Sequence, residues 1–267
     1  MKKMLSIVIC IIIMLTGILS AACAEDQVFS GQTIIGIIGA MDEEVASLKA
    51  AVESPEKTSV AGMEFCKGKL DGVDVVIVQC GVGKVNAGVC AQLLIRVFGA
   101  ERVINTGVAG SLDARLDIGD IVVSTDAVQH DFDVSAIGFK KGEVPFTGLV
   151  VFPADKELVS SACRVIADTL PEVNVLAGRI CSGDQFISDK AAKDRIVAEF
   201  GGLRCEMEGA AVAQVCTLNN VPFLILRAVS DSADESAGED FNFSLFQSSV
   251  AEEFAAAIIK LIAAITE

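Results

Sequence analysis

Two short stretches carry most of the information in this chain: GGLRCEMEGAAV at residues 201–212 and LRAVSD at residues 226–231. The first predicts a helix that begins with two carboxylates, Glu206 and Glu208, on either side of a methionine. The second closes a nearly continuous apolar strand. Ligands of open α/β sheets bind in the crevice at the carboxyl ends of the strands. We therefore expect these two acids and Arg227 to gather in such a crevice.

The rest of the chain alternates between two kinds of apolar pattern. Apolar runs with little period-two alternation are typical of strands buried on both faces, and they cover residues 33–38, 73–79, 102–106, 120–124, 175–182 and 221–229. Three-to-four-residue apolar periodicity predicts helices over residues 42–52, 84–98, 155–169, 190–200, 206–218 and 248–266. Because strands and helices alternate without a linker or an internal repeat, we expect one layered α/β domain with a largely parallel sheet over residues 33–267.

The first 24 residues have the pattern of a secretory signal peptide. Two lysines precede an apolar run over residues 5–19, and Ala22-Cys-Ala24 supplies a cleavage site of small residues. Residues 25–32 then form a short lead-in to the domain. We expect export to the periplasm or to the cell exterior. Two alternatives remain open: lipid attachment at Cys23, which would make a lipoprotein, or an uncleaved segment that acts as a membrane anchor.

The charge of the chain excludes several classes of partner. The formal net charge is −15 at pH 7, and removal of the leader with its two lysines makes the chain still more acidic. Such a protein repels the phosphates of nucleic acids and the headgroups of anionic lipids. We therefore expect no nucleic-acid partner, and membrane association only through a lipid on Cys23 or a retained leader.

Neither the cysteines nor the glycines indicate a bound metal or cofactor. Two of the nine cysteines lie in the leader, and the other seven have no CxxC or Cys/His spacing, so we interpret them as free buried thiols. Glycine-bearing turns follow predicted strands at residues 39–41, 81–84 and 107–110. None of them has the spacing of a phosphate-binding or dinucleotide-binding loop. We expect no metal and no cofactor.

A third acidic motif, Asp42-Glu-Glu44, opens a predicted helix directly after the first strand. Taken alone, acids in a first helical turn are explained by their interaction with the helix dipole. However, IIGAMDEEV at residues 37–45, together with the two stretches quoted above, resembles the methylthioadenosine/S-adenosylhomocysteine nucleosidase branch of the nucleoside phosphorylase/nucleosidase superfamily. The resemblance extends from about Ile34 to the end of the chain, with the motifs in the same order. It implies a homodimer and a three-layer αβα fold with a central mixed, largely parallel twisted sheet.

The resemblance also implies an activity, the hydrolysis of the N-glycosidic bond of 5′-methylthioadenosine and S-adenosylhomocysteine to adenine and a 5-thio-substituted ribose. Glu44 matches the carboxylate that positions and deprotonates the attacking water, and Asp231 matches the acid that protonates N7 of the departing purine. Protonation offsets the negative charge that the base would otherwise carry. Water attacks the oxocarbenium-like sugar from the opposite face, so the two carboxylates act as in inverting glycoside hydrolysis.

Ten further residues inherit substrate contacts from the resemblance. Met207 and Glu208 would contact the ribose, with Glu208 accepting hydrogen bonds from its hydroxyls. Phe186 would stack on the purine, and the backbone of the next residue, Ile187, would contact the Watson–Crick edge of the base. Arg227 would hold the water-activating carboxylate in place, and Phe241 would close over the purine. The set is completed by Met41, Val108, Phe139 and Ser230.

Val108 and Phe139 depart from the family pattern. Val108 stands where these nucleosidases commonly have serine. Phe139 stands where an aromatic residue with a hydroxyl, from the partner subunit, often lines the pocket for the 5′ substituent. Loss of both hydroxyls leaves the preferred 5′ substituent open. His130, the only histidine, lies in a stretch that is structural and interface-forming in the family, so we expect no catalytic role for it.

Other functions remain open from the sequence. Phosphorylases of the same fold need an anion pocket, and the acids of residues 42–44 would repel phosphate, which favours a hydrolase. A hydrolase of futalosine-type or other purine nucleosides is a second hypothesis. A catalytically silent exported protein for nucleoside binding or adhesion is a third, and the complete set of Glu44, Glu208, Arg227 and Asp231 argues against it.

Overall fold

The computed structural model describes residues 33–240 and 251–266. The predicted leader, the lead-in over residues 25–32 and Phe241 lie outside the described residues, so the predictions made for them stay predictions. Within the described ranges, no helix is both long enough and apolar enough to cross a membrane.

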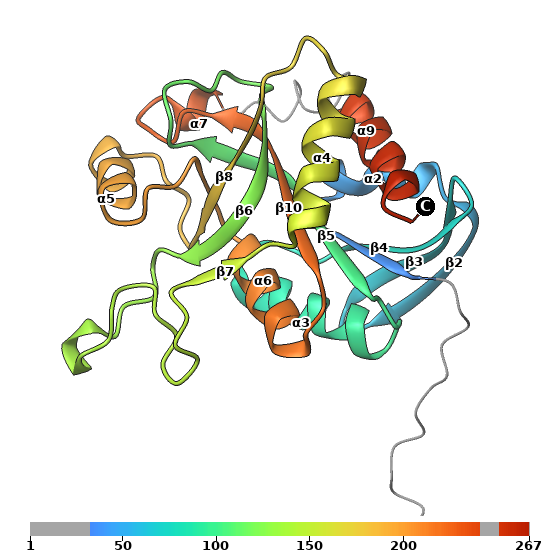
Figure 1. The fold of residues 1–267 in the computed structure, drawn as a ribbon, viewed down its shortest axis with the longest axis horizontal. Helices are drawn as coiled ribbons and strands as arrows, with labels where there is room; N and C mark the ends of the chain where they lie inside the picture. The colour runs from blue at the N-terminus through green and yellow to red at the C-terminus, as the bar shows by residue number, and fades with distance from the viewer. Residues whose placement is uncertain (1–32, 241–250, 267) are drawn as a thin grey trace, which may run out of the picture. The chain divides into compact units, whose positions relative to one another are not determined.

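A mixed sheet forms the centre of the described part of the chain (Figure 1). Its strands are β1 (Ile35–Gly39), β2 (Glu53–Val60), β3 (Met63–Leu70), β4 (Val73–Gln79), β5 (Arg102–Ser111), β6 (Ile121–Gln129), β7 (Val151–Pro153), β8 (Val175–Ser182), β9 (Arg204–Glu206) and β10 (Phe223–Asp231). They follow the order β10-β6-β8-β9-β5-β1-β4-β3-β2, with β7 paired to β6. β1 is parallel to both β4 and β5, and β5 is parallel to β10. Because β10 pairs with β5 as well as with β6, the strands β10, β6, β8, β9 and β5 close into a ring.

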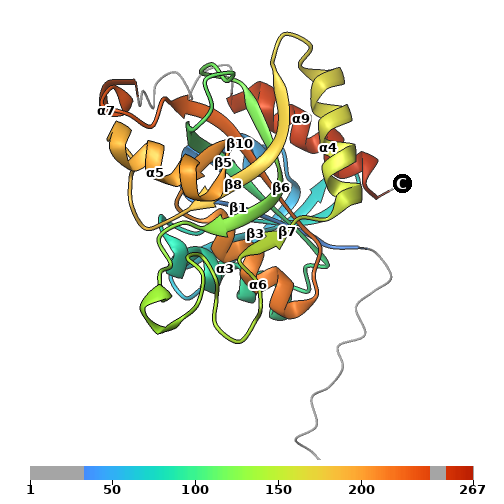
Figure 2. The ribbon, with the colours of Figure 1, turned by 60° about the vertical axis from the view of Figure 1, so that its left-hand side comes forward.

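Helices cover both faces of this sheet. They are α2 (Asp42–Ala50), α3 (Lys84–Arg96), α4 (Lys156–Thr169), α5 (Lys190–Phe200), α6 (Gly209–Asn219), α7 (Ala237–Asp240) and α9 (Ala251–Ala264). Buried side chains of α3 and α6 pack in one hydrophobic core, and those of α2, α4 and α9 pack in a second core. Figure 2 shows α3 and α6 together on one side of the sheet and α4 with α9 on another. The predicted three-layer αβα fold with a central mixed sheet is confirmed.

Local sequence explains where these elements lie. The five residues of β1, IGIIG, are all buried, as expected for a strand covered on both faces. Asp155 begins α4 because its carboxylate accepts hydrogen bonds from the N–H groups of the second and third helical residues. Gly201 ends α5 with a φ of 64°, a left-handed conformation that favours glycine. This helix start and this helix end thus occur where the sequence provides a capping residue and a glycine.

Two predicted boundaries near the ligand crevice are wrong. The helix expected from Glu206 begins at Gly209, because Glu206 ends β9 and its carboxylate accepts hydrogen bonds from the N–H groups of Glu208 and Gly209. β5 continues to Ser111 through a segment predicted as a turn, whereas β10 ends at Asp231, as expected from the LRAVSD stretch. The sheet therefore extends further into the crevice than the sequence indicated.

Candidate active site

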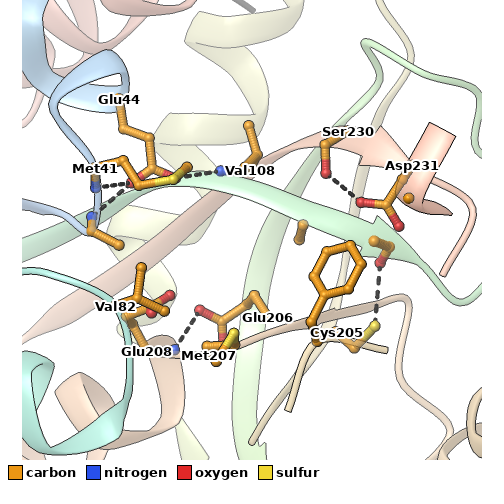
Figure 3. Close-up of a pocket in the computed structure, with 15 residues that line it drawn as sticks. Met41, Glu44, Val82, Val108, Cys205, Glu206, Met207, Glu208, Ser230 and Asp231 are labelled. Carbon is orange, nitrogen blue, oxygen red and sulfur yellow. Dashed lines mark hydrogen bonds between the residues drawn. The ribbon is translucent and has the colours of Figure 1, made fainter. Parts of the chain in front are cut away.

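The carboxyl ends of β1, β5 and β10 border a cavity of about 430 Å³. These strands are parallel, so the residues that end or follow them meet at one edge of the sheet, as predicted. β9 is antiparallel to β5 and brings Cys205 and Glu206 to the same cavity. Eight of the predicted site residues line it: Met41, Glu44, Val108, Phe186, Met207, Glu208, Ser230 and Asp231 (Figure 3).

Glu44 enters the cavity from the first turn of α2. Its Oε2 accepts hydrogen bonds from the backbone N–H groups of Ala40 (2.6 Å) and Met41 (3.0 Å), and its Oε1 accepts one from the N–H of Val108 (3.0 Å). This approach requires glycine at position 107, because a Cβ on Gly107 would lie 2.4 Å from Oε1 of Glu44. Three fixed backbone donors therefore hold the carboxylate in one orientation.

The environment of Glu44 makes it a suitable base. Burial raises the pKa of its carboxyl above the ordinary value, although the charge of Arg227 and the three backbone N–H groups act in the opposite direction. A carboxylate with a raised pKa accepts a proton more readily than an ordinary one.

Arg227 lies beneath the cavity and does not line it. Its side chain is almost completely buried, and its guanidinium pairs with the carboxylate of Glu206. It also donates to the side-chain oxygen (2.5 Å) and the carbonyl oxygen (3.2 Å) of Asn105. Asn105 donates in turn to the carbonyl of Ile38 (3.0 Å). Arg227 thus links β10, β9, β5 and β1 beneath the site, and its positive charge acts on Glu44, Glu206 and Glu208.

Glu206, to which we assigned no role from the sequence, is a centre of hydrogen bonding. Besides pairing with Arg227, it accepts from the hydroxyl of Ser182 and from the N–H groups of Glu208 (3.1 Å) and Gly209 (2.7 Å). The Ser182 hydroxyl itself accepts from the N–H of Ala210 (2.7 Å). Glu206 therefore fixes both the start of α6 and the guanidinium beneath the cavity.

Glu208 stands at the N-terminal end of α6 and faces the loop that precedes α3. Its Oε1 accepts a hydrogen bond from the N–H of Gly83 (2.7 Å), whose φ of 101° favours glycine. The loop is anchored at the next residue, Lys84, whose backbone N–H donates to Asp184 (2.8 Å) and whose ammonium pairs with Asp131 (2.5 Å). Burial raises the pKa of Glu208 to about 7; the charge of Glu206 adds to this effect, and the charge of Arg227 opposes it.

Asp231 ends β10 and is almost completely buried. Its Oδ2 accepts a hydrogen bond from the hydroxyl of Ser230 (2.6 Å), and its Oδ1 accepts one from the N–H of Ala233 (2.8 Å). In Figure 3, Asp231 and Glu44 lie well apart, each at the edge of the cavity. Two carboxylates thus approach the cavity from different strands, with space for a ligand between them.

Apolar side chains form the remaining walls. Met41 and Val108 lie beside Glu44, and Met207 lies between the two glutamates of β9 and α6. Phe186, which is half exposed, and Val82 complete this lining. An apolar cavity with a few fixed polar groups is typical of sites for small organic ligands such as nucleosides. In the part of the chain that the structure describes, no three His, Cys, Asp or Glu side chains are grouped as metal ligands.

The comparisons with known proteins agree with this geometry. The model of the phosphorylase superfamily matches residues 34–266. The chain is 43% identical over 209 residues to the 5′-methylthioadenosine/S-adenosylhomocysteine nucleosidase of Shewanella sediminis, a match that covers 78% of this chain and 90% of that protein. The chain belongs to this nucleosidase family. The prediction of a purine nucleoside N-glycosidase is confirmed.

Two solved structures illustrate the range of the nucleosidase fold. The nucleosidase of the same name from Neisseria meningitidis, in complex with methylthio-immucillin-A, matches with a TM-score of 0.82 at 37% identity and covers 87% of this chain and 99% of that one. The futalosine hydrolase of Helicobacter pylori matches with a TM-score of 0.80 at 34% identity and covers 87% of this chain and 98% of that one. The fold therefore accommodates both kinds of hydrolase.

Besides Arg227, three residues predicted for the nucleosidase site are not placed in the cavity. Ile187 is buried in a hydrophobic cluster with residues of α5, and Phe139 packs edge-on against Phe146. Neither lines the cavity, and Phe241 lies outside the described residues. Phe139 was expected to reach the site of a partner subunit, so the fact that it does not line the cavity of its own chain is compatible with that prediction. The roles of all three residues stay predictions.

Proposed function

We propose that this nucleosidase hydrolyses the N-glycosidic bond of 5′-methylthioadenosine and S-adenosylhomocysteine, with release of adenine and a 5-thio-substituted ribose. The observation that carries the choice of water over phosphate is the carboxylate of Glu44, which three backbone N–H groups fix at the cavity. These donors would otherwise be available to an anion. Because the carboxylate occupies them, the site repels phosphate and is suited to hold a water molecule.

In the proposed mechanism the two separated carboxylates act on opposite sides of the ribose. Asp231 donates a proton to N7 of the purine as the C1′–N9 bond breaks and its electron pair moves to the base. The oxygen of water attacks C1′, and Glu44 accepts a proton from that water. Glu208 accepts hydrogen bonds from the ribose hydroxyls, and its negative charge stabilises the positive charge that develops on the sugar. Arg227 acts through its neighbours, because it holds Glu206 and does not face the cavity.

We expect turnover without phosphate. Enzyme dialysed into phosphate-free buffer should release adenine from 5′-methylthioadenosine at the same rate as enzyme in buffer with added phosphate, and the sugar product should be the free 5-methylthioribose. Adenine release and the sugar product can be followed by chromatography. A requirement for phosphate, or formation of a ribose 1-phosphate, would refute the hydrolase assignment.

A second candidate function is hydrolysis of futalosine-type nucleosides. The structural similarity to a futalosine hydrolase favours it, and the fold and the level of identity are close to those of the methylthioadenosine enzymes. Valine and phenylalanine at positions 108 and 139 also leave the choice of 5′ substituent open. Side-by-side rates with 5′-methylthioadenosine, S-adenosylhomocysteine, adenosine, inosine and futalosine distinguish the two candidates. The proposed function predicts the highest kcat/KM for the 5′-thio-substituted adenosines.

We propose further that the enzyme acts as a homodimer in which residues 130–139 reach toward the neighbouring cavity. Three exposed valines support this proposal: Val82, which lines the cavity, and Val85 and Val89 on the adjoining face of α3. Ile137, within residues 130–139, and Phe146, which packs against Phe139, are also exposed. Exposed apolar side chains in such a group are typical of subunit interfaces.

Sedimentation equilibrium should therefore give twice the monomer mass. Val85→Glu should shift the protein toward the monomer and lower activity at low enzyme concentration, because it places a charge in the apolar contact. Val97→Glu, at the other end of the same helix and at a similarly exposed valine, serves as the matched control. A fully active wild-type monomer would contradict the shared site.

We propose, finally, that the protein is exported and cleaved after Ala24. The support is the order of three elements in the sequence: the lysines, the apolar run and the small residues of the cleavage site. The seven unpaired cysteines of the described residues are unusual for an exported protein, but they are mostly buried. N-terminal sequencing of protein from the native host should show a start at Glu25. A start at Met1 in a cytosolic fraction would contradict export, and a lipid on Cys23 would replace cleavage after Ala24 with membrane anchoring.

A further inference from the structure

Three carboxylates share one guanidinium in the floor and wall of the cavity. Glu44 comes from α2, Glu206 from β9 and Glu208 from the start of α6, and the charge of Arg227 on β10 acts on all three. Glu206, Glu208 and Arg227 are each less than a tenth exposed. If all four groups were ionised, the cluster would carry two uncompensated negative charges away from water, which is strongly unfavourable.

Among the described residues, the surrounding elements supply no second counter-charge to these three carboxylates. The buried guanidinium of Arg204, at the start of β9, interacts instead with Asp113, Asp120 and Asp231. On the side of α3, the ammonium of Lys84 pairs with Asp131, and Asp184 adds a further acid to that loop. On the side of β6, burial lowers the pKa of His130, so its imidazole is neutral near pH 7. Among the described residues, compensation of the three carboxylates therefore comes from Arg227 and from N–H and O–H donors.

These donors are distributed unequally among the three carboxylates. Glu206 has the guanidinium, the hydroxyl of Ser182 and two backbone N–H groups. Glu44 has three backbone N–H groups. Glu208 has one, from Gly83. Hydrogen bonds to the ionised form stabilise it, so the carboxyl with the fewest donors is the one that retains a proton.

We propose that Glu208 holds a proton in the ligand-free site near neutral pH and releases it to solvent when a nucleoside with a free 2′,3′-diol binds. The inference rests on the proposed function, in which the ribose hydroxyls donate hydrogen bonds to this carboxylate. Those two hydrogen bonds stabilise the ionised form of Glu208, which has one hydrogen-bond donor in the free site. The released proton leaves Glu208 ionised beside the sugar, where the transition state develops positive charge.

The expected size of the effect follows from the raised pKa of Glu208. With a value of about 7 in the free site and full ionisation in the complex, binding releases about 0.9 proton at pH 6, about 0.5 at pH 7 and about 0.1 at pH 8. Binding must then strengthen as the pH rises. We expect the Kd to fall by roughly tenfold between pH 6 and pH 8.

Titration calorimetry of Asp231→Asn with 5′-methylthioadenosine tests the proposal. This variant slows hydrolysis and has no ionisable side chain at residue 231. At each pH, the binding enthalpy is measured in two buffers of different ionisation enthalpy, and the difference gives the number of protons released. We expect the enthalpies to differ at pH 6 and to converge at pH 8. Equal enthalpies in both buffers at pH 6 would overturn the proposal.

Two controls assign the proton to Glu208. Adding Glu208→Gln to Asp231→Asn should abolish the proton release. Adding Glu44→Gln should reduce it but not abolish it, because the charge of Glu44 is a minor cause of the raised pKa of Glu208; the reverse outcome would place the proton on Glu44 and refute the assignment. The second control uses 5′-methylthio-2′,3′-dideoxyadenosine, which should bind more weakly and release no proton. It keeps the proposal testable if the Glu208 variant fails to bind or to fold. Proton release with the dideoxy ligand would also contradict the proposal.

Failure of the proposed function gives a different result. If 5′-methylthioadenosine does not bind at all and the wild-type enzyme releases no adenine from it, the substrate assignment is wrong and this inference falls with it. If the nucleoside binds and is hydrolysed but the buffers give equal enthalpies, the substrate assignment stands and only the proton on Glu208 is refuted.

Discussion

Replacing Asp231 with asparagine is expected to slow adenine release by about a hundredfold to ten-thousandfold, the usual contribution of a positioned general acid. The carboxamide has the same shape as the carboxyl group, and its oxygen can still accept a hydrogen bond from the Ser230 hydroxyl or from the N–H of Ala233. It has no proton to give to N7 at neutral pH. The loss should therefore appear in kcat, and the Kd for 5′-methylthioadenosine should change little.

Asp234→Asn is the matched control for this substitution. Asp234 lies three residues further along the chain, undergoes the same change of side chain on substitution and does not line the cavity. We expect its activity to stay near that of the wild type. Wild-type turnover in Asp231→Asn would remove Asp231 from the mechanism.

A change of leaving group separates proton donation from a general loss of structure. In a 5-methylthioriboside that carries 4-nitrophenolate instead of adenine, the leaving group departs without protonation. Asp231→Asn should hydrolyse this compound at a rate close to that of the wild type. A misfolded or misaligned site would instead lower the hydrolysis rate of both substrates equally. An equal loss on both substrates would contradict the role of Asp231 as an acid.

The α/β class could be predicted from the sequence because its central strands are buried on both faces. β1 has five buried residues in succession, and its short length, its β-branched isoleucines and its glycines favour a strand over a buried helix. β2 was missed because its residues, ESPEKTSV, are nearly all exposed and show no apolar pattern. It is held in place by antiparallel pairing with β3, which local sequence does not reveal.

The site could be predicted only where motif residues act through their own side chains. Glu44, Glu208 and Asp231 stand in the quoted motifs, and all three line the cavity. Glu206 stands in the same motif, but its role depends on α6 starting at Gly209, three residues later than expected. A carboxylate in a first helical turn would face solvent or interact with the helix dipole. A carboxylate at the end of β9 instead reaches Arg227.

Ion pairs between residues far apart in the sequence, which support the residues around the cavity, could not be predicted from the sequence. Lys84 and Asp131 are 47 residues apart, and their ion pair holds the loop from which Gly83 donates to Glu208. A lysine and an aspartate at such a separation are indistinguishable from the many other charged residues of the chain. Only the close approach of α3 to the end of β6 makes them partners.

Replacing Glu44 with glutamine should also cost about a hundredfold to ten-thousandfold in kcat, because it removes the base that accepts the proton of the attacking water. The substitution disturbs the site in a second way. Glu44 accepts three backbone N–H bonds, and a glutamine side chain must turn its NH₂ group toward at least one of these donors. The carboxamide therefore holds the water less precisely as well as failing to deprotonate it.

The pH dependence of kcat identifies the base. Glu44 must be ionised to act, so the kcat of the wild type falls as the pH drops below the pKa of Glu44 in the complex. Because burial raises this pKa, the fall should begin at a higher pH than an ordinary glutamate would give. Measuring kcat at saturating substrate separates this effect from the pH dependence of binding that we assign to Glu208. In Glu44→Gln the acidic limb should disappear from the small residual rate.

Glu43→Gln provides the matched control, since Glu43 precedes Glu44 on the same helix, loses the same charge and does not line the cavity. Its rate and pH profile should be those of the wild type. If Glu44→Gln kept wild-type turnover, or kept an unchanged acidic limb, another group would have to deprotonate the water. The three backbone donors around Glu44 would then serve only to hold the first turn of α2 against β5.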